Sequence, residues 1–134
     1  GKTYAKTHAE ELGKHFAAIE ADSGGFAPAA FGLSMEGAER EQKGAEQLKD
    51  LLPLFSALAP MSVKTGFAGA DISPMKSSGV PLLGLRTEGS IYFDYHHTPA
   101  DTFDKVDPDE LSRSVAAMAG LAYILAEMPG KLGE

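Results

Sequence analysis

Asp22 and the adjacent pair His96 and His97 have the types and positions of metal ligands in this chain. Asp22 follows the mostly apolar run at 16–21, which predicts a buried strand of a parallel sheet. Ligands of open α/β sheets bind outside the carboxyl ends of the strands, so a carboxylate at that point is a natural ligand for a hard cation. The other interpretation is that Asp22 only caps the turn predicted at 23–25.

The histidine pair follows a strand-like run and precedes the stretch 98–102, which is rich in side-chain oxygen atoms. A zinc-bound histidine usually donates its second ring N–H to an oxygen acceptor, and this bond fixes the tautomer. Asp101 is close enough in sequence to provide such an acceptor to His96 or His97. The alternative is a pair of surface histidines on a loop.

Other chemical signatures are absent. His8 and His15 do not form the H-E-x-x-H zinc motif, because the second histidine is in the wrong place, and we interpret both as helix-surface or packing residues. The chain contains no phosphate-binding glycine motif of the P-loop or dinucleotide type and no G-x-S-x-G nucleophile motif. With no cysteine present, any metal must be bound by histidines and carboxylates.

Composition excludes several classes of function. The formal net charge of −7, from 12 basic and 19 acidic residues, argues against binding of nucleic acid through its phosphates. No apolar run approaches the roughly 20 residues that a membrane-spanning helix needs, so no membrane partner is predicted. The length suits one domain. The chain opens at Gly1 in a helix-like stretch, so we expect a fragment of a longer protein.

Alternating apolar runs and helical patterns predict the elements that position these residues. We expect helices at 2–15, 35–52 and 107–127, strands at 16–21, 61–65, 80–85 and 90–93 (the last at an edge), a loop at 26–34 and a helical turn at 71–74. Strands that alternate with helices favour an α/β fold, with a mixed, mostly parallel sheet flanked by helices.

The C-terminal helix has the clearest start signal. Asp107 can cap it, Pro108 suits its first position, and Glu110 lies three residues after the cap. The apolar stripe expected to face the core comprises Leu111, Val115, Met118, Ala122 and Leu125.

Three motifs together resemble those of a known family. The segment 18–28, AIEADSGGFAP, is similar to the surroundings of a zinc-binding aspartate in the di-zinc aminopeptidases. The segment 69–75 with 79–81 resembles the loop that borders their active site, and 92–108 resembles their C-terminal zinc-histidine signature. The order and spacing are right over nearly the whole chain, and the plasma glutamate carboxypeptidase-like branch is the most similar.

The resemblance implies a zinc exopeptidase that hydrolyses a terminal peptide bond of a peptide substrate with metal-activated water. Two zinc ions would share a bridging carboxylate, with Asp22 a ligand of one and His97 a ligand of the other. The family's histidine directly precedes Thr/Ser-x-x-Asp-Thr, which selects His97. His96, Asp71 and Asp101 would then lie on the substrate side or behind the ligands.

The departures from the family pattern are also informative. The first His-x-Asp pair, the bridging aspartate and the Glu-Glu pair with the general base would all lie upstream of Gly1. We therefore expect residues 1–134 to be the C-terminal portion of a single zinc-peptidase catalytic domain, inactive alone. Missing strands would leave a sheet edge or an apolar face uncovered, so we expect the chain alone either to self-associate or to be less stable than a complete domain. The sequence itself does not specify the compartment; the resemblance points to an exported, secreted or periplasmic, parent protein, because family members are often exported.

Two other functions stay open at this point. A related zinc cyclase acts on N-terminal glutamine, and activity on glutaminyl peptides would distinguish it from a peptidase. A non-catalytic interaction module could also keep the fold, and the residues upstream of Gly1 would decide that question.

Overall fold

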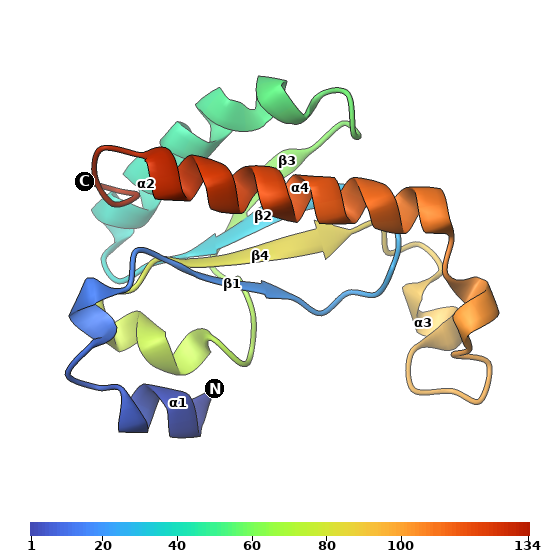
Figure 1. Cartoon of the computed structure of the whole chain (residues 1–134), viewed down its shortest axis with the longest axis horizontal. Coiled ribbons are helices and arrows are strands. Elements are labelled where there is room, and N and C mark those ends of the chain that lie inside the picture. Colours follow the sequence, from blue (N-terminus) through green and yellow to red (C-terminus); the bar gives the residue numbers. More distant parts are fainter.

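A four-stranded mixed sheet forms the centre of the fold, which a computed structural model describes for all residues 1–134 (Figure 1). The strands, in the order β1-β4-β2-β3 across the sheet, are β1 Ala18–Ala21, β4 Leu82–Thr87, β2 Pro28–Ser34 and β3 Ser62–Thr65. β1 pairs with β4 and β2 with β3 in parallel, whereas the central pair β2–β4 is antiparallel. The predicted α/β fold with a mixed, mostly parallel sheet is confirmed.

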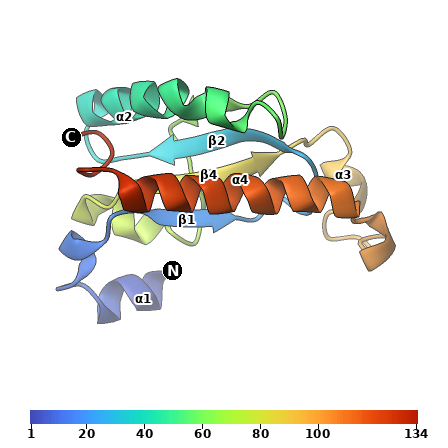
Figure 2. The ribbon, with the colours of Figure 1, turned by 45° about the horizontal axis from the view of Figure 1, so that its top comes forward.

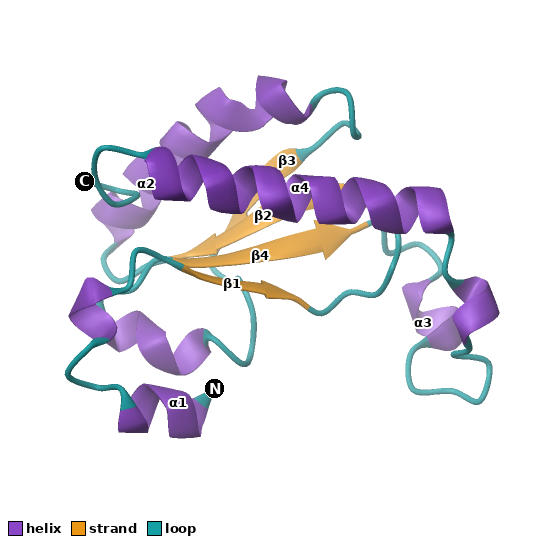
Figure 3. Ribbon diagram, viewed as in Figure 1, coloured by secondary structure: helices purple, strands orange, loops and turns teal.

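Helices form a layer on each side of the sheet (Figures 1 and 3). The long helices α2, Ala38–Leu51, and α4, Pro108–Glu127, cover one face together. Shorter segments cover part of the other face: α1, Lys2–Thr7, and 3-10 turns at Leu12–Lys14 and Ser73–Ser78. The remaining helical segments are α3, Tyr92–Tyr95, and 3-10 turns at Leu52–Phe55 and Phe103–Lys105.

Alternation along the central strands divides the apolar residues into two cores. Phe31 and Leu33 of β2, with Leu83 and Leu85 of β4, pack under α2 and α4. Leu82 points to the other face and joins a smaller cluster with Leu12, Ile72, Met75 and Val80. Successive strand residues point to opposite faces, so the same alternation fixes which residues of β1 and β4 face the site.

The C-terminal helix is confirmed, but the predicted apolar stripe is only partly buried: Leu125 is buried and Met118 packs against the core, whereas the rest of the stripe, Leu111, Val115 and Ala122, is exposed. Asp107 caps α4, because its carboxylate accepts the backbone N–H groups of Asp109 and Glu110 at 2.8 and 2.9 Å. The residues of α4 that are buried are Ser114, Ala117, Leu121 and Leu125. Small side chains let the helix lie close to the sheet, where the Ser114 hydroxyl donates to the Phe26 carbonyl at 2.7 Å. Leu111 and Val115 are left 42% and 59% exposed. Figure 2 shows α4 lying across the strands of the sheet.

The predicted loop at 26–34 is wrong, because most of this segment is the central strand β2. Its glycine, proline and aromatic residues indicate a loop when the segment is taken in isolation. Within the sheet, neighbours on both edges satisfy its backbone hydrogen bonds, and small residues allow close approach of other chain segments. Pro28 stands at the first position of the strand, where a missing N–H is tolerated.

The predicted edge strand at 90–93 is also wrong, since α3 begins at Tyr92. Ile91 and Phe93 stay 43% and 79% exposed, so no sheet neighbour stabilises an extended conformation there. The expected helix at 2–15 ends at Thr7 and resumes only as the turn at 12–14. Smaller differences affect α2, which starts three residues later than predicted, and β4, which is displaced by two residues.

Candidate metal centre and substrate pocket

The carboxyl ends of β1 and β4 open toward α3 and the segment that follows it (Figure 1). Two cavities of about 340 and 430 Å³ lie at this end, and both are lined by Asp22 and Tyr92. Asp22 is the first residue beyond β1, so the end of that strand places its carboxylate in the crevice. This is the position at which open α/β sheets bind ligands.

The larger cavity contains most of the residues predicted from the sequence. It is lined by Asp22, His96, His97 and Asp101, although His97 lies 75 positions after Asp22 in the sequence. The two histidine rings stack with centroids 3.8 Å apart. A carboxylate and an imidazole in one cavity are the kinds of donor that zinc accepts, so this donor set fits the metal.

The backbone of His97 has a left-handed conformation, unlike that of every other non-glycine residue. Its φ of 57° is the only positive value outside glycine. A left-handed conformation costs a residue with a side chain on the order of 1–3 kcal/mol and persists only where the surroundings enforce it. The preceding helix α3 ends at Tyr95, with His96 as its C-cap, and the reversal at His97 redirects the chain into the segment 98–106.

Asp71 and Asp101 have different surroundings. Asp71 lines neither cavity, and its backbone N–H donates to the Glu20 carboxylate at 2.9 Å. Asp101 lines the histidine cavity, but no hydrogen bond joins its carboxylate to His96 or His97. The structure thus brings Asp101 to the candidate ligands and leaves Asp71 on the loop beside the smaller cavity.

Lys105 is the one lysine or arginine that lines the histidine cavity. Its ammonium group pairs with the Asp104 carboxylate, which also accepts a hydrogen bond from the Thr102 hydroxyl at 2.5 Å. The bond from Lys105 and then that from Thr102 lower the pKa of Asp104 from 3.8 to about 2. The bond to Asp104 in turn raises the pKa of Lys105, so this lysine remains protonated.

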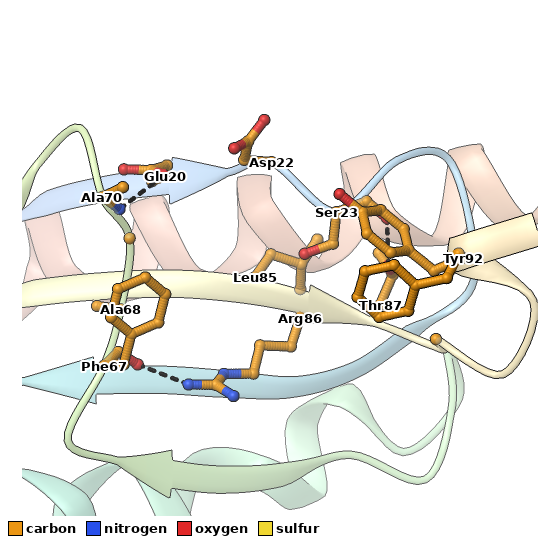
Figure 4. Close-up of a pocket in the computed structure, with 13 residues that line it drawn as sticks. Glu20, Asp22, Ser23, Phe67, Ala68, Ala70, Leu85, Arg86, Thr87 and Tyr92 are labelled. Carbon is orange, nitrogen blue, oxygen red and sulfur yellow. Dashed lines mark hydrogen bonds between the residues drawn. The ribbon is translucent and has the colours of Figure 1, made fainter. Parts of the chain in front are cut away.

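The smaller cavity has apolar and charged walls (Figure 4). Its walls come from the ends of β1 and β4, the loop 67–70 and the start of α3, with the aromatic rings of Phe67, Tyr92 and Phe93 on its border. Glu20 fixes the loop, because its carboxylate accepts the backbone N–H groups of residues 70, 71 and 72 at 3.1, 2.9 and 3.1 Å.

Two glycines make room for this loop. Gly32 of β2 and Gly84 of β4 are paired residues at the centre of the sheet. A Cβ at Gly84 would lie 1.8 Å from the Ala68 carbonyl oxygen, and one at Gly32 would lie 2.7 Å from that of Phe67. Only residues without a side chain allow the loop to lie directly on the sheet.

Glu20 and Arg86 line the pocket but were not singled out from the sequence. The signal for Glu20 was the two-residue period of a strand, which places Glu20 and Asp22 on the same face. The only sequence signal for Arg86 is its place near the end of an apolar strand. The chain contains no cluster of three or more histidine, aspartate or glutamate residues that could hold a metal ion by itself.

Comparison with known proteins now identifies the family. The sequence profile of Peptidase family M28 matches residues 1–122. The chain belongs to peptidase family M28. The family resemblance drawn from the three motifs is therefore confirmed, and the M28 family is one of hydrolases.

Individual M28 relatives agree with this assignment. Carboxypeptidase Q of Mus musculus is 32% identical over 125 residues, which cover 93% of this chain and 26% of that protein. The human protein of the same name is 29% identical over the same share of this chain. The crystal structure of a Peptidase M28 precursor from Shewanella amazonensis SB2B superimposes with a TM-score of 0.75 and 36% identity, covering 98% of this chain and 29% of that one.

The chain spans about a quarter of the length of the curated relatives it matches. None of its helices combines the length and the apolar character needed to cross a membrane.

Proposed function

We propose that this M28 chain supplies part of the active site of a zinc-dependent exopeptidase, as the C-terminal portion of its catalytic domain. Asp22 would bind one of two zinc ions and His97 the other. The observation that carries the proposal is that these two residues, far apart in sequence and each matched to a zinc ligand by its motif, line one cavity at the carboxyl end of the sheet. When bound, zinc polarises the carbonyl of a peptide bond and lowers the pKa of a water molecule.

The chain's own residues would hold the metals and position the substrate. The Asp22 carboxylate is a hard oxygen donor, and the His97 ring supplies a neutral nitrogen donor. Phe67, Tyr92 and Phe93 border the adjoining pocket, where they would contact the terminal residues of a peptide. The bridging carboxylate and the general base are expected from segments of the parent protein that precede Gly1.

This proposal is tested by measuring, in the full-length protein, the amount of bound zinc and the rate of dipeptide hydrolysis. Asp22→Asn and His97→Gln should each reduce bound zinc from two ions toward one and lower kcat/KM for a dipeptide by at least about 100-fold, since each removes a ligand of one metal. The matched controls are Asp50→Asn, at the exposed end of α2, and His8→Gln, near the N-terminus. Each should retain two zinc ions and the wild-type kcat/KM.

Wild-type zinc content and turnover in the Asp22 and His97 variants would refute the ligand assignment. Cyclisation of a glutaminyl peptide without hydrolysis of any peptide bond would refute the exopeptidase function instead. Absence of zinc binding and of both activities in the wild type would indicate a non-catalytic member of the family.

A further inference from the structure

The His97 ring makes no hydrogen bond within the chain. The histidine side chains that do so are those of His8 and His15. A zinc-bound histidine usually donates its second ring N–H to an oxygen acceptor, and this bond holds the ring in place. Asp101 lies in the same cavity without making such a bond, and His97 is exposed. Neither burial nor a hydrogen bond therefore orients the ring of the proposed ligand.

Aromatic stacking provides the contacts that the His97 ring has. It stacks on the His96 ring, with centroids 3.8 Å apart and 22° between the planes. The His96 ring stacks in turn on that of Tyr92, at 4.6 Å and 24°. Phe93 meets this pair edge-on, 5.1 Å from Tyr92 and 6.0 Å from His96. Stacked and edge-to-face arrangements are both favourable between aromatic rings. A column of nearly parallel rings thus runs from Tyr92 to the proposed metal ligand.

One helical turn and one backbone reversal build this column. The His96 N–H donates to the Tyr92 carbonyl at 2.9 Å, and residues four apart on a helix lie on the same side. Adjacent helical residues, by contrast, point about 100° apart around the axis. The positive φ of His97 breaks the helical path, and its ring lies on that of His96. The strained backbone of His97 is therefore what allows two consecutive histidines to stack.

Tyr92 is the better anchored end of the column. Its side chain is half-buried, whereas that of His97 is exposed. Its ring lines both cavities at the end of the sheet. Its hydroxyl makes no hydrogen bond in the chain, unlike that of Tyr4. Tyr92 thus acts on the histidines through its ring alone, and phenylalanine is its conservative replacement.

We propose that Tyr92 is a positioning residue for the metal ligand: through His96 it holds the His97 ring in one orientation, so that zinc meets an ordered donor. This inference rests on the proposed function, in which His97 binds one of two zinc ions. Ordering the ring before zinc arrives lowers the entropic cost of binding. Stacking takes the place of the hydrogen bond that orients most zinc-bound histidines.

Zinc titration of the full-length protein against a competing chelator tests this inference. The zinc site in question is the one that is lost in His97→Gln. Tyr92→Leu removes the ring but keeps an apolar side chain, and it should weaken that site by about 10-fold, the lower end of the effect of losing an outer partner of a metal ligand. The other zinc site should keep its affinity. Tyr92→Phe retains the ring and should keep both affinities.

Tyr95→Leu is the matched control. Tyr95 belongs to the same helical turn, is half-buried and lines the histidine cavity, but its ring is not part of the column. It should keep both zinc affinities. Unchanged zinc binding in Tyr92→Leu would overturn the proposal, and so would an equal loss in Tyr95→Leu, which would indicate general damage to α3. An equal loss in Tyr92→Phe would assign the effect to the hydroxyl and overturn it as well.

Ring-current shifts of the histidines give a second measurement that needs no metal. In metal-free full-length protein labelled with [ε1-¹³C]histidine, His96→Gln and His97→Gln assign the two Hε1 resonances. At constant pH, both resonances should move in Tyr92→Leu and stay in place in Tyr95→Leu. If the wild type binds no zinc, the proposed function fails separately, and these shifts decide whether Tyr92 orients the His97 ring. A His97 resonance at the same position in wild type and Tyr92→Leu would overturn the proposal.

Discussion

The Glu20 carboxylate accepts the backbone N–H of Asp71 at 2.9 Å, although the two residues are 51 positions apart. Hydrogen bonds from residues 70 and 72 reach the same carboxylate. One side chain on β1 thus fixes the loop that borders the candidate substrate pocket, and this side chain lies two residues before the candidate metal ligand Asp22. The motif segments at 18–28 and 69–75 are therefore in direct contact in the fold.

Replacement of this carboxylate should loosen the loop. In Glu20→Gln the amide oxygen is a weaker acceptor, and the new NH₂ group faces backbone donors. We expect the free energy of unfolding to fall by roughly 1–2 kcal/mol, and the amides of residues 70–72 to exchange faster with solvent. Urea denaturation and hydrogen exchange measure these effects. Glu46→Gln, whose carboxylate bonds only the Gln42 side chain, should change stability by less than about 0.5 kcal/mol. Unchanged protection of the loop amides in Glu20→Gln would contradict this role.

The backbone of His97 predicts opposite effects on stability and on metal binding. Glycine adopts a φ of 57° without strain, so His97→Gly should keep or raise the stability of the metal-free protein by up to about 1 kcal/mol. The same change removes the proposed ligand, so zinc affinity should fall by more than about 100-fold. Thermal unfolding with chelator, and zinc titration of the full-length protein, measure the two quantities.

His96→Gly is the control for this experiment, because His96 has a negative φ of −49° and is not assigned as a ligand. It should lower stability, since glycine adds freedom to the unfolded chain without relieving strain. Its zinc affinity should fall less than that of His97→Gly. The reverse order of affinities would exchange the roles of the two histidines.

Sequence patterns predicted elements wherever local signals and burial agree. The capped helix at 107–127 and the apolar strands at 16–21 and 80–85 are of this kind. The prediction missed β2 because its Gly32 reflects close packing against the loop at Phe67 and Ala68, a contact between distant segments that no local pattern encodes. The burial phase of α4 was missed because Ser114 and Ala117 favour close approach over maximum apolar burial.

The candidate site was predictable only in part for the same reason. Asp22 and His97 belong to motifs, and their chemistry is visible in the residue types. Glu20 and Arg86 act through backbone groups of the loop at 67–72, which their own sequence neighbourhoods do not reveal. Whether Asp22 and His97 bind zinc stays a prediction.

The turn that follows the histidines predicts a specific titration. Hydrogen bonds from Lys105 and Thr102 lower the pKa of Asp104 to about 2, so this carboxylate should remain ionised at pH 3. Because the folded pKa lies below the ordinary value of 3.8, the pair stabilises the fold above that pH, and the contribution is lost as the pH falls toward 2. Since the carboxylate is exposed, the effect on stability should be small.

NMR titration of the Asp104 carboxyl carbon measures this pKa. In Lys105→Met it should move back toward 3.8, since the largest cause of the shift is removed. Lys49→Met, on α2, should leave it unchanged. A pKa near 3.8 in the unmodified protein would show that the ion pair does not persist in solution.

The 134-residue chain by itself should not be an efficient peptidase. It contains no group of three or more potential ligands, and no residue in it is assigned as general base. Loss of the base alone costs about 10²- to 10⁴-fold in rate, and an incomplete metal centre costs more. Assays with dipeptides in excess zinc measure this. Robust turnover that is abolished by chelator and by His97→Ala would show that the chain contains a complete site.

The exposed side of α4 and the outer edge of β1 predict self-association of the isolated chain. β1 has a strand neighbour on one side only, and Leu111 and Val115 are 42% and 59% exposed on α4. Free strand edges and apolar side chains both favour association, here with a second copy. Sedimentation velocity should show an average mass that increases with concentration, and the double variant Leu111→Lys with Val115→Lys should reduce the increase without lowering stability. Leu54→Lys is the control, because Leu54 is 69% exposed in the 3-10 turn Leu52–Phe55 that follows α2. A monomer at all concentrations would contradict the prediction, and an equal effect of Leu54→Lys would assign association to general hydrophobicity.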